Sequence, residues 1–212
     1  PALSNVLYSE DILFPIADFY LKKERWNEAI EVYEEMETIG ALQGRGAEYY
    51  QKLGYALQKN KKYAEAIDAY LKADTLKPDN IWNNRHLAIC YRLNRNYQAA
   101  LSYYKKVEEA TPEDTNVIFH IGSCLAELGQ YEEAANYFFK LDFIESNCIK
   151  AWRGIGWCSF ISRKYEQAMK YYEKIIEQKP LAIDYMNAGH VAWTMGDIQK
   201  AAALYGKSIT AN

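Results

Sequence analysis

The 212-residue sequence lacks any apolar run long enough to cross a membrane, and no secretory signal peptide is recognisable in it. It also lacks an excess of charge, because 25 basic and 28 acidic residues leave a net charge of -3. A nucleic-acid-binding protein usually carries a basic footprint, and this balance provides none over the whole chain. We therefore expect neither a membrane span in this segment nor a nucleic acid as its partner.

The short motifs of common enzyme classes are missing as well. The sequence has no phosphate-binding loop, no Gly-x-Ser-x-Gly elbow and no Cys-x-x-Cys pair. Two of the three histidines, His86 and His120, recur at the spacing of the repeat described below, but no carboxylate or cysteine evidently completes a zinc site with them. We expect no enzyme activity, no catalytic residue, no cofactor and no bound metal.

Cysteines are few, and three of the four follow the same regular spacing. Cys90, Cys124 and Cys158 are 34 residues apart, so they occupy the same place in the first helices of three successive repeats. Packed helices lie about 8–10 Å apart, whereas a disulfide needs Cα atoms within about 7 Å. We therefore expect reduced core thiols, with no evident partner for Cys148. Reduced thiols favour a cytoplasmic location. The sequence starts at Pro1 rather than Met, which suggests a trimmed N-terminus from which a signal or an anchor could have been removed.

A signature with a period of about 34 residues is the strongest pattern present. Each full copy has an aromatic residue, an alanine three positions later and a second aromatic four positions after that, as in Tyr63, Ala66 and Tyr70. A fixed period of this length predicts an all-α solenoid of stacked antiparallel helix hairpins. Such a solenoid presents a surface rather than burying an active site. The repeated alanines, including two divergent copies at the ends, are Ala29, Ala66, Ala100, Ala134, Ala168 and Ala201.

The period divides the chain into one array of six repeats. We place their boundaries at residues 10–43, 47–80, 81–114, 115–148, 149–181 and 182–212, and residues 1–9 form an N-terminal flank or the end of a preceding helix. Short polar turns inside each repeat force its two helices to run antiparallel. Pro78, Pro112 and Pro180 end second helices, because proline cannot continue a helix.

Two places depart from this regularity. The spacing from Ala29 to Ala66 is three positions longer than the others, so extra residues fall near 40–46, and we expect an extended second helix or a glycine-rich loop there. Pro15 lies inside the first helix of the first repeat, which either kinks there or starts near Phe14. We favour the second option, in which residues 1–13 form a separate helical segment.

The periodic aromatic and alanine residues and the prolines that end second helices resemble the tetratricopeptide repeat, whose pattern is W-x2-L-G-x2-Y followed by A-x3-F and a proline. The resemblance implies a right-handed superhelix, with the first helix of each repeat lining a concave groove. It also implies protein or peptide binding as the usual role. The match is fullest in the second repeat, at Tyr50, Leu53, Gly54, Leu57, Ala66, Tyr70, Ala73 and Pro78.

Helical spacing identifies the side chains that would face this groove in repeats three to six. They are unusually aromatic and basic, which are residue types that binding hot spots favour. Our hypothesis is a groove for a peptide with acidic and apolar side chains, and the alternative is that the aromatic residues pack against neighbouring helices. The candidate partner-binding residues are Trp82, Arg85, His86, Arg92, Asn116, Phe119, His120, Lys150, Arg153, Trp157, Phe160, Asn187, His190 and Trp193.

The kind of partner is narrowed but not named. Gly154 stands where tetratricopeptide domains that grip chaperone tails carry an arginine, which argues against that ligand. A scaffold that binds a protein or peptide is the favoured function. The alternative is a regulatory or targeting module of a larger enzyme or membrane-associated assembly.

The last helix, near Ala201 and Ile209, should expose apolar surface, which predicts truncation from a longer array or self-association through this end.

Overall fold

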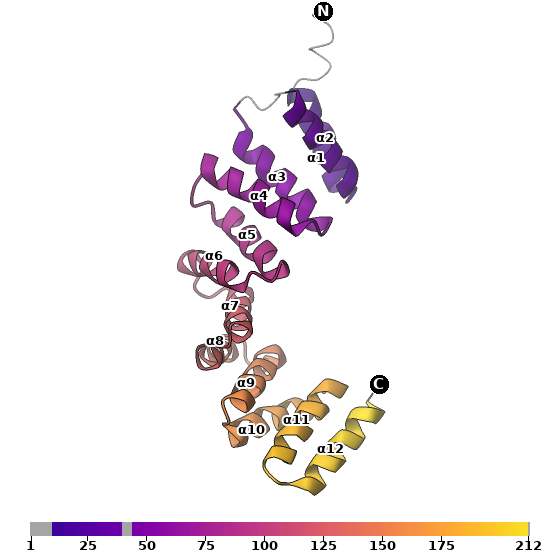
Figure 1. The fold of residues 1–212 in the computed structure, drawn as a ribbon, viewed down its shortest axis with the longest axis vertical. Coiled ribbons are helices and arrows are strands. Elements are labelled where there is room, and N and C mark those ends of the chain that lie inside the picture. The colour runs from indigo at the N-terminus through magenta and orange to yellow at the C-terminus, as the bar shows by residue number, and fades with distance from the viewer. Residues whose placement is uncertain (1–9, 40–43, 212) are drawn as a thin grey trace, which may run out of the picture. The chain divides into compact units, whose positions relative to one another are not determined.

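The computed structural model describes residues 10–39 and 44–211. These residues form twelve α-helices and no strand, and consecutive helices pair as antiparallel hairpins (Figure 1). An all-α solenoid of about six hairpins is therefore confirmed. None of these twelve helices has the length and apolarity that a membrane span requires. Their bounds are α1 (Glu10–Lys22), α2 (Trp26–Thr38), α3 (Gly46–Lys59), α4 (Tyr63–Leu76), α5 (Ile81–Leu93), α6 (Tyr97–Ala110), α7 (Thr115–Glu127), α8 (Tyr131–Ile144), α9 (Ile149–Ile161), α10 (Tyr165–Ile176), α11 (Ala182–Thr194) and α12 (Ile198–Thr210).

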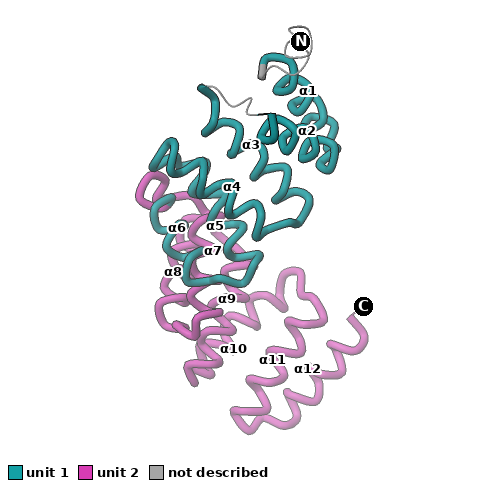
Figure 2. Tube along the Cα trace, turned by 45° about the horizontal axis from the view of Figure 1, so that its top comes forward, with its two compact units in different colours: residues 1–107 teal, residues 108–212 magenta. Residues whose placement is uncertain are grey.

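The chain divides into two compact units, which Figure 2 shows in different colours. Unit 1 comprises residues 1–107 and holds α1 to α5 with most of α6. Unit 2 comprises residues 108–212 and holds the end of α6 with α7 to α12. Each unit is described below by itself.

In four of the six described hairpins, an aromatic ring of the second helix lies directly on a glycine of the first. A Cβ atom at Gly54 would lie 2.8 Å from the ring of Tyr70, and one at Gly189 would lie 2.6 Å from the ring of Tyr205. No side chain fits at these positions, so the two helices approach closely. The alanine of the repeated signature is fully buried in the same packing layer, which explains why both residue types recur with the period.

The four cysteines are buried and carry thiol groups. Burial raises the pKa of Cys90 to about 12 and that of Cys158 to about 11, so both thiols stay protonated at neutral pH. Among the described residues no disulfide forms, and the four side chains act as small apolar groups in the core.

The turn inside every hairpin contains one residue in the left-handed conformation. Unit 2 uses glycine at two of its three turns, Gly129 and Gly196. A residue with a side chain is strained in this conformation, by about 1–2 kcal/mol. The chain nevertheless places Glu24, Lys61, Arg95 and Arg163 in the other four turns, with φ between 56° and 63°.

The expected separate segment over residues 1–13 is wrong for the part that the structure describes. α1 runs without a break from Glu10 to Lys22 and includes Pro15. Proline there removes one backbone donor near the start of the helix, while Phe14 and Ala17 on either side are buried in the core. The apolar contacts of these neighbours hold the helix together. Residues 1–9 lie outside the described residues.

An extended second helix after Ala29 is also wrong. α2 ends at Thr38 and has 13 residues, one fewer than the equivalent α4. The extra residues therefore fall in the connection between α2 and α3, where Gly44 has a φ of +88°. The glycine-rich loop was the other expectation for this stretch, but residues 40–43 lie outside the described residues.

The glycine–aromatic contact predicts opposite effects for two glycines of the last hairpin. Gly189→Ala forces a Cβ atom into the Tyr205 ring and should lower the free energy of unfolding by about 1–3 kcal/mol. Gly206→Ala, at an exposed site in α12 where a Cβ atom meets no neighbour within 4 Å, should raise it by about 0.5–1 kcal/mol. Urea unfolding of both variants measures the difference. Equal shifts for the two would contradict the packing described here.

Candidate functional site

The fourteen candidate residues are divided between the two units. Four of them lie on α5 in unit 1, and ten lie on three first helices of unit 2. A groove that includes both groups stays a prediction. The ten in the second unit are Asn116, Phe119 and His120 on α7, Lys150, Arg153, Trp157 and Phe160 on α9, and Asn187, His190 and Trp193 on α11.

In unit 1, His86 belongs to an aromatic cluster that packs three helices together. Its ring centre lies 4.0 Å from that of Trp82 and 5.7 Å from that of Tyr70, on which it stacks. Its Nδ1 atom is 2.8 Å from Oε1 of Gln58. Burial lowers the pKa of His86 to about 4, so the ring is neutral at pH 7. His86 therefore fits the alternative interpretation, in which the side chain packs within the array.

Four further candidates line neither of the pockets described below. Arg85 and Arg92 are half-buried on α5, where Nε of Arg92 donates to the Tyr104 hydroxyl over 3.4 Å. Asn116 is exposed at the start of α7. The ring of His120 meets that of Phe119 edge to face at 5.4 Å.

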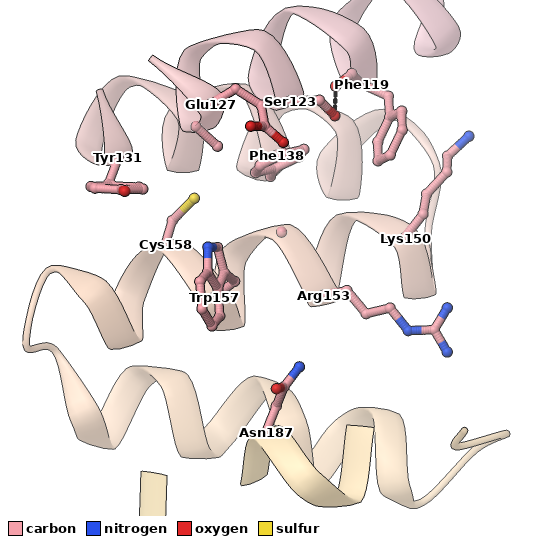
Figure 3. Close-up of a pocket in the computed structure, with 12 residues that line it drawn as sticks. Phe119, Ser123, Glu127, Tyr131, Phe138, Lys150, Arg153, Trp157, Cys158 and Asn187 are labelled. Carbon is pink, nitrogen blue, oxygen red and sulfur yellow. Dashed lines mark hydrogen bonds between the residues drawn. The ribbon is translucent and has the colours of Figure 1, made fainter. Parts of the chain in front are cut away.

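The remaining eight candidates surround two pockets of unit 2. The first pocket has a volume of about 680 Å³ and lies between α7, α9 and α11 (Figure 3). Lys150 and Arg153 extend from one end of α9, and Tyr131 lies at the opposite end of the pocket. The lining residues are Phe119, Ser123, Ala126, Glu127, Tyr131, Phe138, Lys150, Arg153, Gly154, Trp157, Cys158 and Asn187.

The bottom of this first pocket is formed by Phe138, which reaches it from the second helix α8. A Cβ atom at Gly122 of α7 would lie 2.9 Å from the Phe138 ring, and one at Gly154 of α9 would lie 2.5 Å from it. The ring is thus held between two glycine backbones. Because Gly154 has no side chain, the surface above it stays open.

Arg153 is held by a buried carboxylate of the next hairpin. Its Nε and Nη2 atoms donate to the two Asp184 oxygens over 2.7 Å each, and only 1% of the Asp184 side chain is exposed. The same Asp184 accepts a bond from the backbone N–H of Leu181 at the start of α11. The Arg153 charge is therefore matched within unit 2, and its main contact ties α9 to α11.

Lys150 contributes a weaker and more accessible charge. Its Nζ lies 3.3 Å from a Glu145 oxygen and 5.9 Å from the centre of the Phe119 ring. Both members of the ion pair are more than a third exposed, so water screens the pair strongly. Lys150 can exchange this partner for another carboxylate at little cost.

The second pocket adjoins the first and is more apolar. It has a volume of about 610 Å³ and shares Trp157 and Asn187 with the first pocket. Trp157 is 44% exposed and Trp193 is 59% exposed, which is unusual for the largest apolar side chain. The lining residues are Trp157, Phe160, Ile183, Met186, Asn187, His190, Trp193 and Thr194.

The sequence-based list missed several of the lining residues. Tyr131 and Phe138 belong to the second helix α8, whereas the list was drawn only from first helices. Gly122 and Gly154 could have indicated Phe138, because a glycine on a first helix leaves space for a side chain of the second helix to reach the groove. Ile183 and Met186 share the α11 face with Asn187 and His190, and helical spacing alone places them there.

Neither pocket carries a set of reactive groups. The one thiol in the first pocket, Cys158, is 1% exposed and has a raised pKa. Across residues 10–39 and 44–211, no three His, Cys, Asp or Glu side chains gather as a metal-ligand set. The two pockets offer aromatic surfaces, the Asn187 amide, the Glu127 carboxylate and the accessible Lys150 ammonium, which are suited to binding side chains of another molecule.

The repeats of this chain match a known family. Models described as tetratricopeptide repeat match residues 13–43, 47–80, 92–158, 149–180 and 185–212, which together include most of the chain. No curated protein has a sequence that matches this one.

Several solved structures share the fold. A tetratricopeptide repeat protein from Parabacteroides merdae is 20% identical with a TM-score of 0.77, and the match covers 95% of this chain and 79% of that one. MamA residues 41 to the end from Desulfovibrio magneticus are 18% identical with a TM-score of 0.71, covering 80% and 97%. YrrB, described as having an unusual peptide-binding site, is 20% identical with a TM-score of 0.69, covering 84% and 91%. At these identities the likeness concerns the fold alone.

The ion pair between α9 and α11 predicts a stability effect. Arg153→Ala leaves the buried Asp184 carboxylate without its cation and should lower the free energy of unfolding by about 2 kcal/mol, a value reduced for the exposed part of Arg153. Lys150→Ala breaks an exposed pair in the same pocket and should cost less than about 0.5 kcal/mol. Chemical denaturation of both variants tests this, and an equal loss for both would refute the structural role of Arg153.

The neutral His86 predicts a loss of stability in acid. Its pKa is about 4 in the folded chain and near 6.5 when unfolded, so the unfolded chain binds more protons between these values. The contribution of His86 is complete above pH 6.5 and is lost as the pH falls towards 4, by up to about 3 kcal/mol. Urea unfolding at several pH values should show a shallower acid loss in His86→Phe than in the wild type. Parallel profiles would contradict this assignment.

Proposed function

Because the chain belongs to the tetratricopeptide repeat family, we propose that it is a non-enzymatic scaffold that binds a peptide segment of a protein partner. The observation that carries the proposal is the pair of adjoining pockets on α7, α9 and α11, which share Trp157 and Asn187. Consecutive side chains of an extended segment could occupy the two pockets in turn. The unusual peptide-binding site described for YrrB supports the same role for a related fold.

The second pocket is the anchor site in this proposal. Trp157 and Trp193 expose large ring surfaces, and Ile183 and Met186 add aliphatic surface. Burying such surfaces supplies most of the free energy at binding hot spots. An aromatic or long aliphatic side chain of the partner is therefore the group that we assign to this pocket.

The first pocket would accept a neighbouring side chain of the segment. Phe138 provides an apolar bottom, while Lys150 provides a cation at the edge. Arg153 contributes less charge than the sequence suggested, because Asp184 already takes up its guanidinium. An acidic residue beside the apolar anchor is thus favoured mainly by Lys150, and the Glu127 carboxylate in the same pocket opposes it in part.

The proposal predicts that one tryptophan dominates binding. A peptide array probed with wild-type protein should identify bound segments rich in aromatic or aliphatic residues. Trp157→Ala removes a wall of both pockets and should weaken the best peptide by about 30-fold or more, equivalent to at least about 2 kcal/mol. Titration calorimetry with that peptide measures the loss.

A matched control is available in unit 1. Trp82 is 43% exposed, close to the 44% of Trp157, but lies on α5 outside both pockets. Trp82→Ala should bind the selected peptide as wild type does, with circular dichroism confirming the helical content of each variant. If Trp82→Ala loses binding and Trp157→Ala retains it, the proposed site is wrong. If wild-type protein binds no peptide, the segment-binding function is refuted.

A further inference from the structure

A second surface, in unit 1, is distinguished by charge rather than by shape. The turns inside its three hairpins span residues 21–25, 58–62 and 92–96, and contain eight basic residues and one acidic residue. The corresponding turns of unit 2, at residues 126–130, 160–164 and 193–197, contain two of each sign. We call the first set the basic edge. Its members are Lys22, Lys23, Arg25, Lys59, Lys61, Lys62, Arg92 and Arg95.

The three turns lie together on one side of unit 1. Figures 1 and 2 both show the α1–α2, α3–α4 and α5–α6 turns along the same margin of the stacked hairpins. A hydrogen bond of 2.7 Å from Asn60 to Asn27 joins the second turn to the start of α2. Gln58, at the start of the second turn, meets His86 of α5 at 2.8 Å. The basic residues therefore lie in turns that share one margin of unit 1.

Two of the basic residues occupy positions where glycine fits better. Lys61 and Arg95 have φ values of 63° and 61°, in the left-handed region that disfavours side chains. Unit 2 uses Gly129 and Gly196 at two of its three equivalent turns and Arg163 at the third, so the fold accepts glycine there and does not require a charged residue. Strain of this kind is often kept where it serves a function.

Most of the charge on the basic edge is available to a partner. Arg25 pairs with Glu28 and Lys62 pairs with Glu65, both at exposed sites. Five of the eight are exposed and form no ion pair with a carboxylate of residues 10–39 and 44–211, namely Lys22, Lys23, Lys59, Lys61 and Arg95. Positive potential accumulates where like charges gather without neutralisation.

We propose that the basic edge docks on an anionic lipid surface. Five of its eight cations are lysines, which act as mobile point charges and suit a diffuse layer of headgroups better than a single carboxylate. Two apolar side chains accompany them: Phe19 is 53% exposed beside Lys23, and Leu93 is 39% exposed in the third turn. Basic residues with exposed apolar groups are the combination that peripheral membrane contacts use. This inference concerns turns of unit 1 and is independent of the peptide site in unit 2.

The test uses the whole chain with lipid vesicles. Sedimentation with phosphatidylcholine vesicles should leave the protein in solution, whereas vesicles that also contain phosphatidylserine should bring it down. Binding should weaken as salt is raised, because the attraction is screened within about 10 Å at 0.1 M ionic strength. Equal behaviour with both vesicle types would overturn the proposal.

The left-handed turn residues provide variants that remove charge without harming the fold. Lys61→Gly with Arg95→Gly should keep or raise the thermal midpoint, because glycine adopts this backbone freely. Each removed charge should weaken vesicle binding about fivefold, and the pair about 30-fold. The control is Arg163→Gly, which makes the same backbone change in a unit 2 turn and should bind vesicles as wild type does.

Three results would count against a lipid surface. If the Lys61→Gly and Arg95→Gly double variant binds vesicles as tightly as the wild type, the basic edge is not the membrane contact. An equal loss in Arg163→Gly would show that total charge, rather than this edge, governs binding. Polyglutamate and RNA serve as competing polyanions, and binding to either without binding to phosphatidylserine vesicles would assign the edge to another class of partner.

Discussion

The contact on which this structure depends is an aromatic ring resting on a bare helix backbone. Tyr70 covers Gly54 and Tyr205 covers Gly189, where a Cβ atom would lie within 3.0 Å of the ring, and Tyr172 covers Gly156, where it would lie 3.0 Å away. The ring fixes the separation of the two helices in a hairpin, and the buried alanine on the second helix lets that helix approach. The contact recurs in four of the six described hairpins, because α1 and α5 contain no glycine and carry buried alanines, Ala17 and Ala88, instead. Small residues on the first helices therefore let the hairpins stack closely within each unit.

The candidate site is a consequence of the same packing. Phe138 is squeezed between Gly122 and Gly154, so an aromatic ring of the second helix becomes the bottom of a pocket on the first-helix side. First-helix residues then stand around it, and Trp157 separates this pocket from its neighbour. The pair of Arg153 with the buried Asp184 holds α9 against α11, which keeps both pockets in shape.

Two surfaces of the chain thus differ in the physical interaction that they offer. The pockets of unit 2 offer apolar area in confined spaces, which favours individual side chains of a partner. The basic edge of unit 1 offers exposed positive charge without a pocket, which favours an extended anionic surface. The pockets are lined by first helices and by one second helix, whereas the basic edge is built from turns. Changes in one surface can therefore be made without touching the other.

The sequence by itself determined the number and type of hairpins, because its fixed period repeats the helix-packing residues directly. Helical spacing also placed Trp157 and Trp193 on a common side. Only the tertiary structure decided that Asp184 neutralises Arg153, that His86 is desolvated by Tyr70 and Trp82, and that Phe138 reaches a pocket on the opposite side of its hairpin. These contacts are between residues of different helices. A periodic pattern predicts the helix face on which a side chain lies, but not the residue of a neighbouring helix that it contacts.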